Sequence, residues 1–528
     1  MKRAAMWALG LGFGMSALAV APASQAQTLR MGVGAQITSI DPHFHNIAPN
    51  NAFAAMVFGR LIETDGAGNL EPSIALSWKA IADDVWEFKL RPGVTFHNGL
   101  AFTADDFAFT VERIPTVANS PGSFSTYTQA ISRVEVVDPL TFRVHTKGPY
   151  PLLASDLAQV PLLSRAIHTG ATTDRFNSGE LAIGTGPFKL TQFRHGERAA
   201  LVRNDAFWGD KPDWARVDYR NITSAPSRAS ALVAGDVDFI DQVPTADVER
   251  LRAAPGVNLS EASSLRFMYI AFDHSRAENS PFITTLDGKP IQNNPLKDVR
   301  VRRALAHAID RDAIVSRVME GVAVAINQVV PPGTYGYSTA LAAPKANPAE
   351  ARRLLAEAGF PQGFAITIHG SNDRYPNDSK ITQAIGQMWT RVGVRTAVEV
   401  QPFGTFVQRA SKQEFSAFLV SWGSATGDPT SALRSMLATF DAARGLGSVN
   451  RGRYSNSAFD TGLIAAMREL DSAKRERGLQ VVAELAIGGD VAVVPLHMQK
   501  NVWGMRPGLR HDARVDESTR AQDVHPAK

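Results

Sequence analysis

A single hydrophobic core stops growing at about 250–300 residues, and this chain has 528. The chain must therefore divide into at least two lobes. Apolar residues make up 44% of it and charged residues 20%, as in an ordinary globular protein. The formal net charge of +4 is small for this length. Because no run of five like charges occurs either, the sequence gives no reason to expect a nucleic acid as partner.

The first 26 residues are typical of a secretory signal peptide. Lys2 and Arg3 precede an apolar run from Ala4 to Ala21, and Ser24-Gln25-Ala26 offers small residues for cleavage before Gln27. The apolar run is barely long enough for the alternative, an uncleaved membrane anchor. Its glycines and the small residues that follow it favour cleavage. The sequence therefore predicts an exported chain that begins at Gln27.

The chain contains no cysteine. Lipid anchoring at the cleavage site needs a cysteine, so we expect no lipid anchor, and thiol catalysis and cysteine-ligated zinc are excluded. The signatures of serine hydrolases, zinc peptidases and phosphate-binding loops are also missing from the sequence. Gly184-Thr185-Gly186-Pro187 begins like a dinucleotide-binding loop but lacks the third glycine, and we interpret it as a turn that enters a strand. We therefore expect neither a cofactor nor an enzymatic activity.

Strand signals recur in the first half of the chain. Apolar and charged residues alternate from Trp86 to Leu90, and this period of two is typical of a half-buried strand. Alternating segments on both sides of a turn predict hairpins within residues 134–144 and 188–201. These stretches predict a β-rich region.

Helices with recognisable caps are interspersed with these strands. Thr103 is expected to be an N-cap, with acidic residues in the first turn. Asn347 is expected to cap another helix, in which Glu350 completes a capping box and Gly359 follows the last turn. The polar tail after Pro507 is expected to lie loosely on the surface. Together these elements predict an α/β protein whose lobes are joined by short strand crossings, since no low-complexity linker separates them.

Seven stretches in a fixed order carry a family resemblance. They are LEPSIALSWKAIADDVWEFKLRPGVTFHNGLAFTADDFAFTVER (Leu70–Arg113), GTGPFKL (Gly184–Leu190), RNDAFWG (Arg203–Gly209), VRRALAHAIDRDAIV (Val301–Val315), ARRLLAEAGF (Ala351–Phe360), SWGSATGDP (Ser421–Pro429) and RYSNSAFD (Arg453–Asp460). The chain resembles the bacterial extracellular solute-binding proteins of family five, which serve peptide- and nickel-type ABC importers. The resemblance covers nearly all of the mature sequence.

The resemblance implies a two-lobed periplasmic-binding-protein clamp of the Venus-flytrap type II, with an extra β-rich subdomain in the first lobe. The core of lobe I would hold residues 27–58, 182–271 and 490–528, and the extra subdomain residues 59–181. Lobe II would hold residues 272–489. The strand near Met268–Asp273 and the segment Val491–Met498 would be the two crossings.

The resemblance also implies a function. The protein would be a periplasmic monomer that captures a small peptide-like or other polar organic solute by hinge closure and delivers it to an ABC transporter permease. One alternative is a nickel- or metal-chelate-binding protein of the same family, for which His43, His45 and His369 are the histidines placed near loops. Another is an exported hydrolase, whose carboxylates Asp373 or Asp428 would have to supply, and nothing in the sequence orients them.

The segment around Trp422 bears on the ligand. Peptide-gripping members of the family hold the ligand's amino terminus with an aspartate three residues after the matching tryptophan, where this sequence has Ala425. A buried ammonium without a countercharge is costly, so Ala425 counts against a conventional peptide ligand. Trp422 is expected to line the cleft through its indole face, or else to be a core residue. Arg434 is expected to grip a carboxylate, or to be structural.

Three loops are expected to form the remaining walls of the cleft. One follows a predicted strand at residues 365–369, at a strand end where loops of a lobe face the cleft. The other two belong to the first lobe, in a polar loop with aromatic residues and in the stretch from Asp41 to Asn46. The candidate contacts in these loops are Asn372, Arg374 and Tyr375, then Ser123, Phe124 and Tyr127, and finally His45.

Overall fold

The computed structural model describes residues 28–424, 426–442 and 444–527. The predicted signal peptide and Ala425 lie outside the described residues. No helix in the described part of the chain is both long and apolar enough to cross a membrane.

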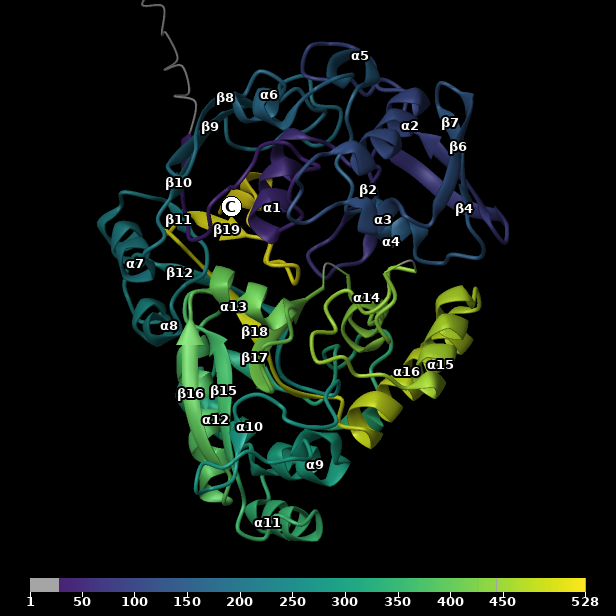
Figure 1. Cartoon of the computed structure of the whole chain (residues 1–528). Helices are drawn as coiled ribbons and strands as arrows, with labels where there is room; N and C mark the ends of the chain where they lie inside the picture. The colour runs from purple at the N-terminus through teal and green to yellow at the C-terminus, as the bar shows by residue number, and fades with distance from the viewer. Residues whose placement is uncertain (1–27, 425, 443, 528) are drawn as a thin grey trace, which may run out of the picture.

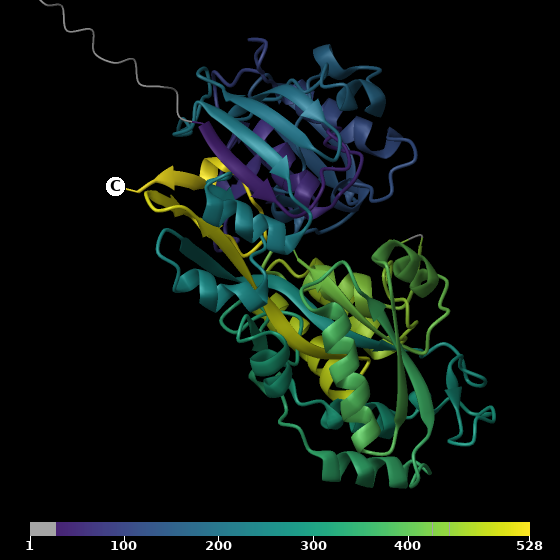
Figure 2. The same ribbon diagram turned by 90° about the vertical axis from the view of Figure 1, so that its left-hand side faces the viewer.

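The chain folds into two lobes that share one twisted sheet (Figure 1). Its twelve strands include ten in the order β13-β15-β17-β12-β18-β11-β1-β10-β9-β8, with β14 beside β18 and β16 beside β15. Two strands, β12 (Asn258–Phe272) and β18 (Val493–Met505), run through both lobes, as Figure 2 shows. The prediction of two α/β lobes joined by strand crossings is confirmed.

Lobe I is built on the β8–β1 end of this sheet. Its strands are β1 (Thr28–Val33), β8 (Phe188–Arg194), β9 (Arg198–Arg203), β10 (Arg216–Asn221) and β11 (Phe239–Ile240). Its main helices are α1 (Ala48–Val57), α7 (Ala225–Ala234) and α8 (Thr245–Arg252).

A separate four-stranded sheet lies within lobe I. It consists of β4 (Ala75–Ala82), β5 (Val85–Leu90), β7 (Thr141–Thr146) and β6 (Ile131–Asp138), in that order. The ring of Phe142 stacks between Phe88, with centroids 5.0 Å apart, and Phe107, with centroids 4.4 Å apart. Around this sheet lie β2 (Ile62–Thr64), β3 (Leu70–Pro72), α2 (Ala104–Arg113), α3 (Ser125–Thr128), α4 (Leu153–Leu157) and α5 (Arg165–His168). The next helix, α6 (Thr173–Asn177), packs its Phe176 into the core of the large sheet of lobe I.

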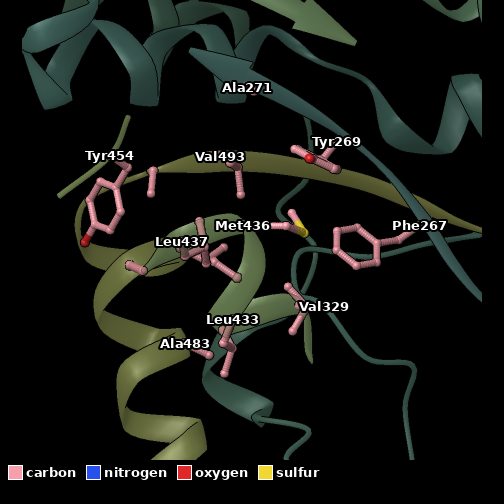
Figure 3. Close-up of a cluster of buried hydrophobic side chains, with 14 of the residues drawn as sticks. Phe267, Tyr269, Ala271, Val329, Leu433, Met436, Leu437, Tyr454, Ala483 and Val493 are labelled. Carbon is pink, nitrogen blue, oxygen red and sulfur yellow. The ribbon is translucent and has the colours of Figure 1, made fainter. Parts of the chain in front are cut away.

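Lobe II is built on the other end of the large sheet. Its strands are β13 (Ile283–Thr284), β14 (Ala323–Ala325), β15 (Ala365–Ser371), β16 (Arg395–Gln401) and β17 (Ala417–Gly423). Its helices are α9 (Val299–Ala308), α10 (Arg311–Ala313), α11 (Pro348–Glu357), α12 (Asp378–Arg391), α13 (Phe403–Ser411), α14 (Thr430–Ala432), α15 (Ser457–Arg468) and α16 (Ser472–Ala483). Figure 3 shows the apolar core on one face of this sheet, where Leu433, Met436 and Leu437 pack under Phe267 and Tyr269.

Many local expectations are confirmed. Both predicted hairpins form, with Val136 opposite Phe142 and Leu190 opposite Leu201. The sequence Gly184-Thr185-Gly186-Pro187 leads into β8 as a turn, and a side chain at Gly184 would place its Cβ 2.0 Å from the Val57 carbonyl oxygen. Glycine is therefore needed there for the close approach of two backbones.

Two expectations are wrong. Asn347 caps α11 by accepting a hydrogen bond from the Glu350 amide, but the Glu350 carboxylate binds Arg353 instead of completing a capping box. The tail after Pro507 is not loose, because it forms β19 (Leu509–His511) and β20 (Val524–Pro526) and packs on lobe I. An ion pair three residues apart on one helix decides the first case, and burial against residues distant in the sequence decides the second.

Candidate functional site

Parallel strands of both lobes end at the space between the lobes. In lobe I, β1 pairs in parallel with β10 and β11, and in lobe II, β15 pairs in parallel with β16 and β17. The loops after β10, β11 and β15 line one common cavity. Sites at the carboxyl ends of parallel strands are typical of α/β proteins, because strand ends position loops on a rigid frame.

We call this space the hinge cavity. Its volume is about 450 Å³, within the range of about 300–1,000 Å³ that is usual for small-molecule sites. Residues 223–246 of lobe I and residues 319–380 of lobe II contribute to its lining. The crossing strands contribute Arg266 and residues 499–503, and the tail contributes Glu517 and Thr519. One cavity thus touches both lobes and both crossings.

Arg266 belongs to the wall of this cavity. Its guanidinium donates to both oxygens of Glu517, at 2.8 and 3.1 Å, and to Ser421 Oγ at 3.0 Å. It also lies over the Tyr375 ring, 5.9 Å from its centroid. Gly423 is opposite Arg266 in the β12–β17 pair, and a Cβ at Gly423 would come within 2.6 Å of Nη2 of this guanidinium. The glycine makes room for the arginine.

Arg374 and Tyr375, which the sequence predicts as ligand contacts, both line the hinge cavity. The Arg374 guanidinium lies 5.3 Å from the Tyr375 ring centroid and 5.8 Å from that of Phe403. Among the described residues no carboxylate comes within ion-pair distance of it. Burial, and to a lesser extent the positive charge of Arg266, lowers the pKa of Arg374 below its usual value. A half-buried guanidinium without a countercharge is a favourable place for an anion.

The lobe I wall of the cavity holds a buried pair. Arg228 donates to the backbone carbonyls of Asp241, Ile222 and Gln242 and lies 3.6 Å from the Asp241 carboxylate. Asp241 Oδ1 accepts a hydrogen bond from the Gly34 amide at 2.7 Å. Burial raises the pKa of Asp241 to about 6, although Arg228 opposes this shift. This pair fixes the loops that follow β1 and β11.

Trp422 lies on the opposite face of the lobe II sheet from Ser421. Along β17, Phe418 and Val420 belong to the core drawn in Figure 3, whereas Ala417 and Leu419 belong to the core beneath α9 and α12. The alternation places Ser421 toward the hinge cavity and Trp422 on the Figure 3 face, where it packs against the core. The Trp422 indole N–H is buried and has no hydrogen-bond partner among the described residues.

Arg434 is buried where lobe II meets the four-stranded subdomain. Its Nη1 donates to Tyr150 Oη of lobe I at 3.3 Å, and Tyr150 Oη donates to Asp156 Oδ2 at 2.6 Å. In Figure 1, α4 of lobe I faces α14 of lobe II, and Tyr150 and Arg434 are close in sequence to these helices. Burial raises the pKa of Asp156 to about 7, against the lowering influence of Arg434 and of the Tyr150 hydrogen bond. The structure therefore gives Arg434 a partner on the opposite lobe.

The other predicted contacts are scattered. Phe124 is buried in the subdomain core with 1% exposure, while Ser123 and Asn372 are exposed. Tyr127 accepts a hydrogen bond from Asn46 at 3.1 Å, and His45 Nδ1 lies 3.0 Å from Thr38 Oγ1. None of these five residues lines the hinge cavity. Ala425 lies outside the described residues.

The comparisons with known proteins agree with this architecture. The family model described as bacterial extracellular solute-binding proteins, family 5, middle region, matches residues 69–444. This is well over half of the chain. The chain belongs to family 5 of the bacterial extracellular solute-binding proteins.

Family 5 members with different cargo are similar to this chain over most of its length. The heme-binding protein A of Haemophilus influenzae is 28% identical, covering 82% of this chain and 80% of that protein. The dipeptide-binding protein of Escherichia coli K12 is 28% identical, covering 80% of both. The periplasmic binding protein DppA of Helicobacter pylori, solved with the peptide STSA, superposes with a TM-score of 0.80 at 24% identity, covering 95% of this chain and 98% of that one. That last likeness supports the fold.

The histidines considered for a metal-chelate ligand have structural partners. His43 is fully buried, its Nε2 lies 2.8 Å from the Pro161 carbonyl oxygen, and burial lowers its pKa to about 4. His369 is fully buried and stacks on Phe415. Within the described part of the chain, no group of three or more metal-ligating side chains is placed to hold a metal ion.

Arg266 and Glu517 were not predicted as site residues from the sequence. They are 251 residues apart, and Glu517 lies in the tail that was expected to be loose. A weak local signal was available for Arg266, because it lies two residues before the predicted crossing at Met268–Asp273, within β12. The sequence carries no local signal for Glu517.

Proposed function

We propose that this family 5 protein is the periplasmic substrate-binding component of an ABC importer. It captures a small peptide-like or other polar organic solute between its lobes by hinge closure and delivers it to the permease. The observation that carries the proposal is the hinge cavity, because both lobes and both crossing strands line it. A solute bound there contacts both lobes at once.

Closure follows from differential contact. A solute that touches both lobes stabilises the closed arrangement more than the open one. A swing from 1:99 to 99:1 in favour of the closed state needs about 5.5 kcal/mol of differential affinity. The pairing of β12 with β18 is irregular between Ser263 and Phe267, next to Arg266. This break in the ladder is the place where the two-stranded connection bends most easily.

We include the predicted contacts in this proposal where the geometry supports them. Arg374 and Tyr375 form the lobe II wall of the cavity, whereas Trp422 lies on the other sheet face and does not line the cavity. Arg434 serves closure through Tyr150. The signal peptide cleaved before Gln27, the free periplasmic monomer and the residue boundaries of the lobes complete the proposal.

A thermal-shift screen of the mature protein, starting at Gln27, tests this function. The panel holds di- to hexapeptides, organic acids, oligosaccharides and nickel chelates. A solute that binds only the folded state raises the melting temperature by mass action. We expect a reproducible rise with one chemical class. If no solute raises the melting temperature and mass spectrometry of the denatured protein finds no solute carried through purification, the transport function is refuted.

A further inference from the structure

The carboxylates of the hinge cavity are already engaged. Both oxygens of Glu517 accept from Arg266, and Oε1 also accepts from Ser264 at 2.9 Å. Asp373 Oδ1 accepts from the Phe403 amide at 2.8 Å. Asp241 accepts from Gly34 and faces Arg228. A ligand ammonium entering this cavity would have to compete with these partners.

The cations of the same cavity are in excess. Arg228, Arg266, Arg374, Lys380 and Lys500 line it, against the three carboxylates named above. In the described part of the chain, Arg374, Lys380 and Lys500 have no carboxylate within ion-pair distance. Lys500 on the crossing strand is half-buried, and Lys380 of lobe II is exposed. Both place positive charge at the hinge cavity. An electropositive cavity attracts an anionic solute.

A neutral donor in the cavity has the same preference. Gln499, with 5% exposure, lines the hinge cavity, and its Nε2 is buried with no hydrogen-bond partner in the part of the chain that the structure describes. An unsatisfied buried donor is stabilised by an acceptor such as a carboxylate oxygen. Gln499 and Lys500 are neighbours on β18, so their side chains leave opposite faces of the strand. Each lines the cavity on its own, one with a neutral donor and the other with a charge.

We propose that the hinge cavity binds an organic acid that carries more carboxylates than ammonium groups. The proposal rests on the proposed function and names its substrate class. Arg374 pairs with one carboxylate, and either Lys500 or Gln499 receives a second acceptor group. A cationic or zwitterionic solute gains less, because its ammonium meets occupied carboxylates and three unpaired cations.

Isothermal titration calorimetry of the mature protein with matched probes tests the class. The probes are glutarate, N-acetylglutamate, glutamate, dialanine, N-acetyl-dialanine, cadaverine and a set of di- and tricarboxylic acids. We expect a dicarboxylate without ammonium to bind at least tenfold more tightly than glutamate, and dialanine and cadaverine to bind more weakly still. Dialanine or cadaverine binding as tightly as the best dicarboxylate would overturn the proposal.

Variants locate the site. Lys500→Gln and Arg374→Gln should each weaken binding of the best dicarboxylate by at least tenfold, and Arg374→Lys should retain part of the affinity because it keeps the charge. Lys474→Gln, an exposed lysine on α16, is the matched control and should change nothing. Unchanged affinity in both folded cavity variants would contradict the site.

The two levels of the proposal fail differently. If peptides or another non-anionic class bind and close the lobes, the transport function stands and the substrate class is wrong. The same holds if a neutral or cationic solute is released from the purified protein. If no probe binds and no solute is released, the proposed function itself fails.

Discussion

Arg374 is half-buried and Arg434 is buried, and these two arginines differ in what faces them. Arg434 is 8% exposed and already donates to Tyr150 of the opposite lobe. Arg374 stacks on Tyr375 and Phe403 and faces no carboxylate among the described residues. From the sequence, both were expected to contact the ligand, Arg434 through a carboxylate. Their surroundings divide the work, because one arginine holds the lobes together and the other is left for the solute.

The difference follows from the cost of burying charge. A buried guanidinium needs a partner, and removal of that partner leaves an uncompensated charge. Lobe I supplies the partner for Arg434 through Tyr150 and the Asp156 carboxylate behind it. No carboxylate in the described chain pairs with Arg374. The unpaired guanidinium therefore lowers the stability of the protein until an anion binds. A site that binds by capture is recognisable by this imbalance.

The largest expected effect on stability concerns Arg434, which already has a partner on the opposite lobe. Arg434→Met leaves Tyr150 and Asp156 without their cation, and we expect the free energy of unfolding without solute to fall by about 3 kcal/mol. Urea denaturation of the mature protein measures this change. A loss below about 0.5 kcal/mol would mean that the interlobe contact carries no weight.

Arg374→Gln should behave in the opposite way. Because the guanidinium has no countercharge, its removal should leave the free energy of unfolding without solute within about 1 kcal/mol of the wild type, or raise it. The same denaturation series compares it with Arg434→Met. Equal destabilisation by the two substitutions would contradict the distinction between the partnered Arg434 and the unpartnered Arg374.

Asp156 makes the contact between Arg434 and Tyr150 sensitive to pH. Burial raises its folded-state pKa to about 7, well above the ordinary value of 3.8, so the folded state holds a proton that the unfolded state releases. Its contribution is therefore fully present below pH of about 4 and is lost as pH rises through about 7. Asp156→Asn should remove this decline, and melting temperatures recorded from pH 4 to 8 compare the two profiles. Parallel profiles for wild type and variant would contradict the assignment.

The smallest effect concerns the fit around Arg266. Gly423→Ala would push its Cβ against the Arg266 guanidinium and disturb the bonds to Ser421 and Glu517. Because the end of a long side chain can move, we expect a loss of about 1 kcal/mol in stability, with a weaker affinity for the solute. Gly427→Ala, where a Cβ meets nothing within 4 Å, is the control.

Local patterns predicted local structure well, and long-range pairing escaped them. The turn at residues 184–187, the hairpins and the cap at Asn347 depend on neighbours in the sequence, and the structure contains all of them. The Arg266–Glu517 pair joins a crossing strand to the tail, and no periodicity marks such a contact. Likewise, no pattern in the sequence distinguishes the partnered Arg434 from the unpartnered Arg374, because the difference lies in the opposite lobe.

The distance between the lobes tests capture by closure most directly. The chain has no cysteine, so Ala67→Cys in lobe I and Ala473→Cys in lobe II, both exposed, give a spin-labelled pair without background. Pulsed electron resonance then records the distance between the labels with and without the dicarboxylate that binds most tightly. We expect this solute to shift the distribution of label distances to shorter values. We expect Arg374→Gln to abolish this shift at the same concentration. A solute that binds with full affinity while the distribution stays unchanged would contradict capture by closure.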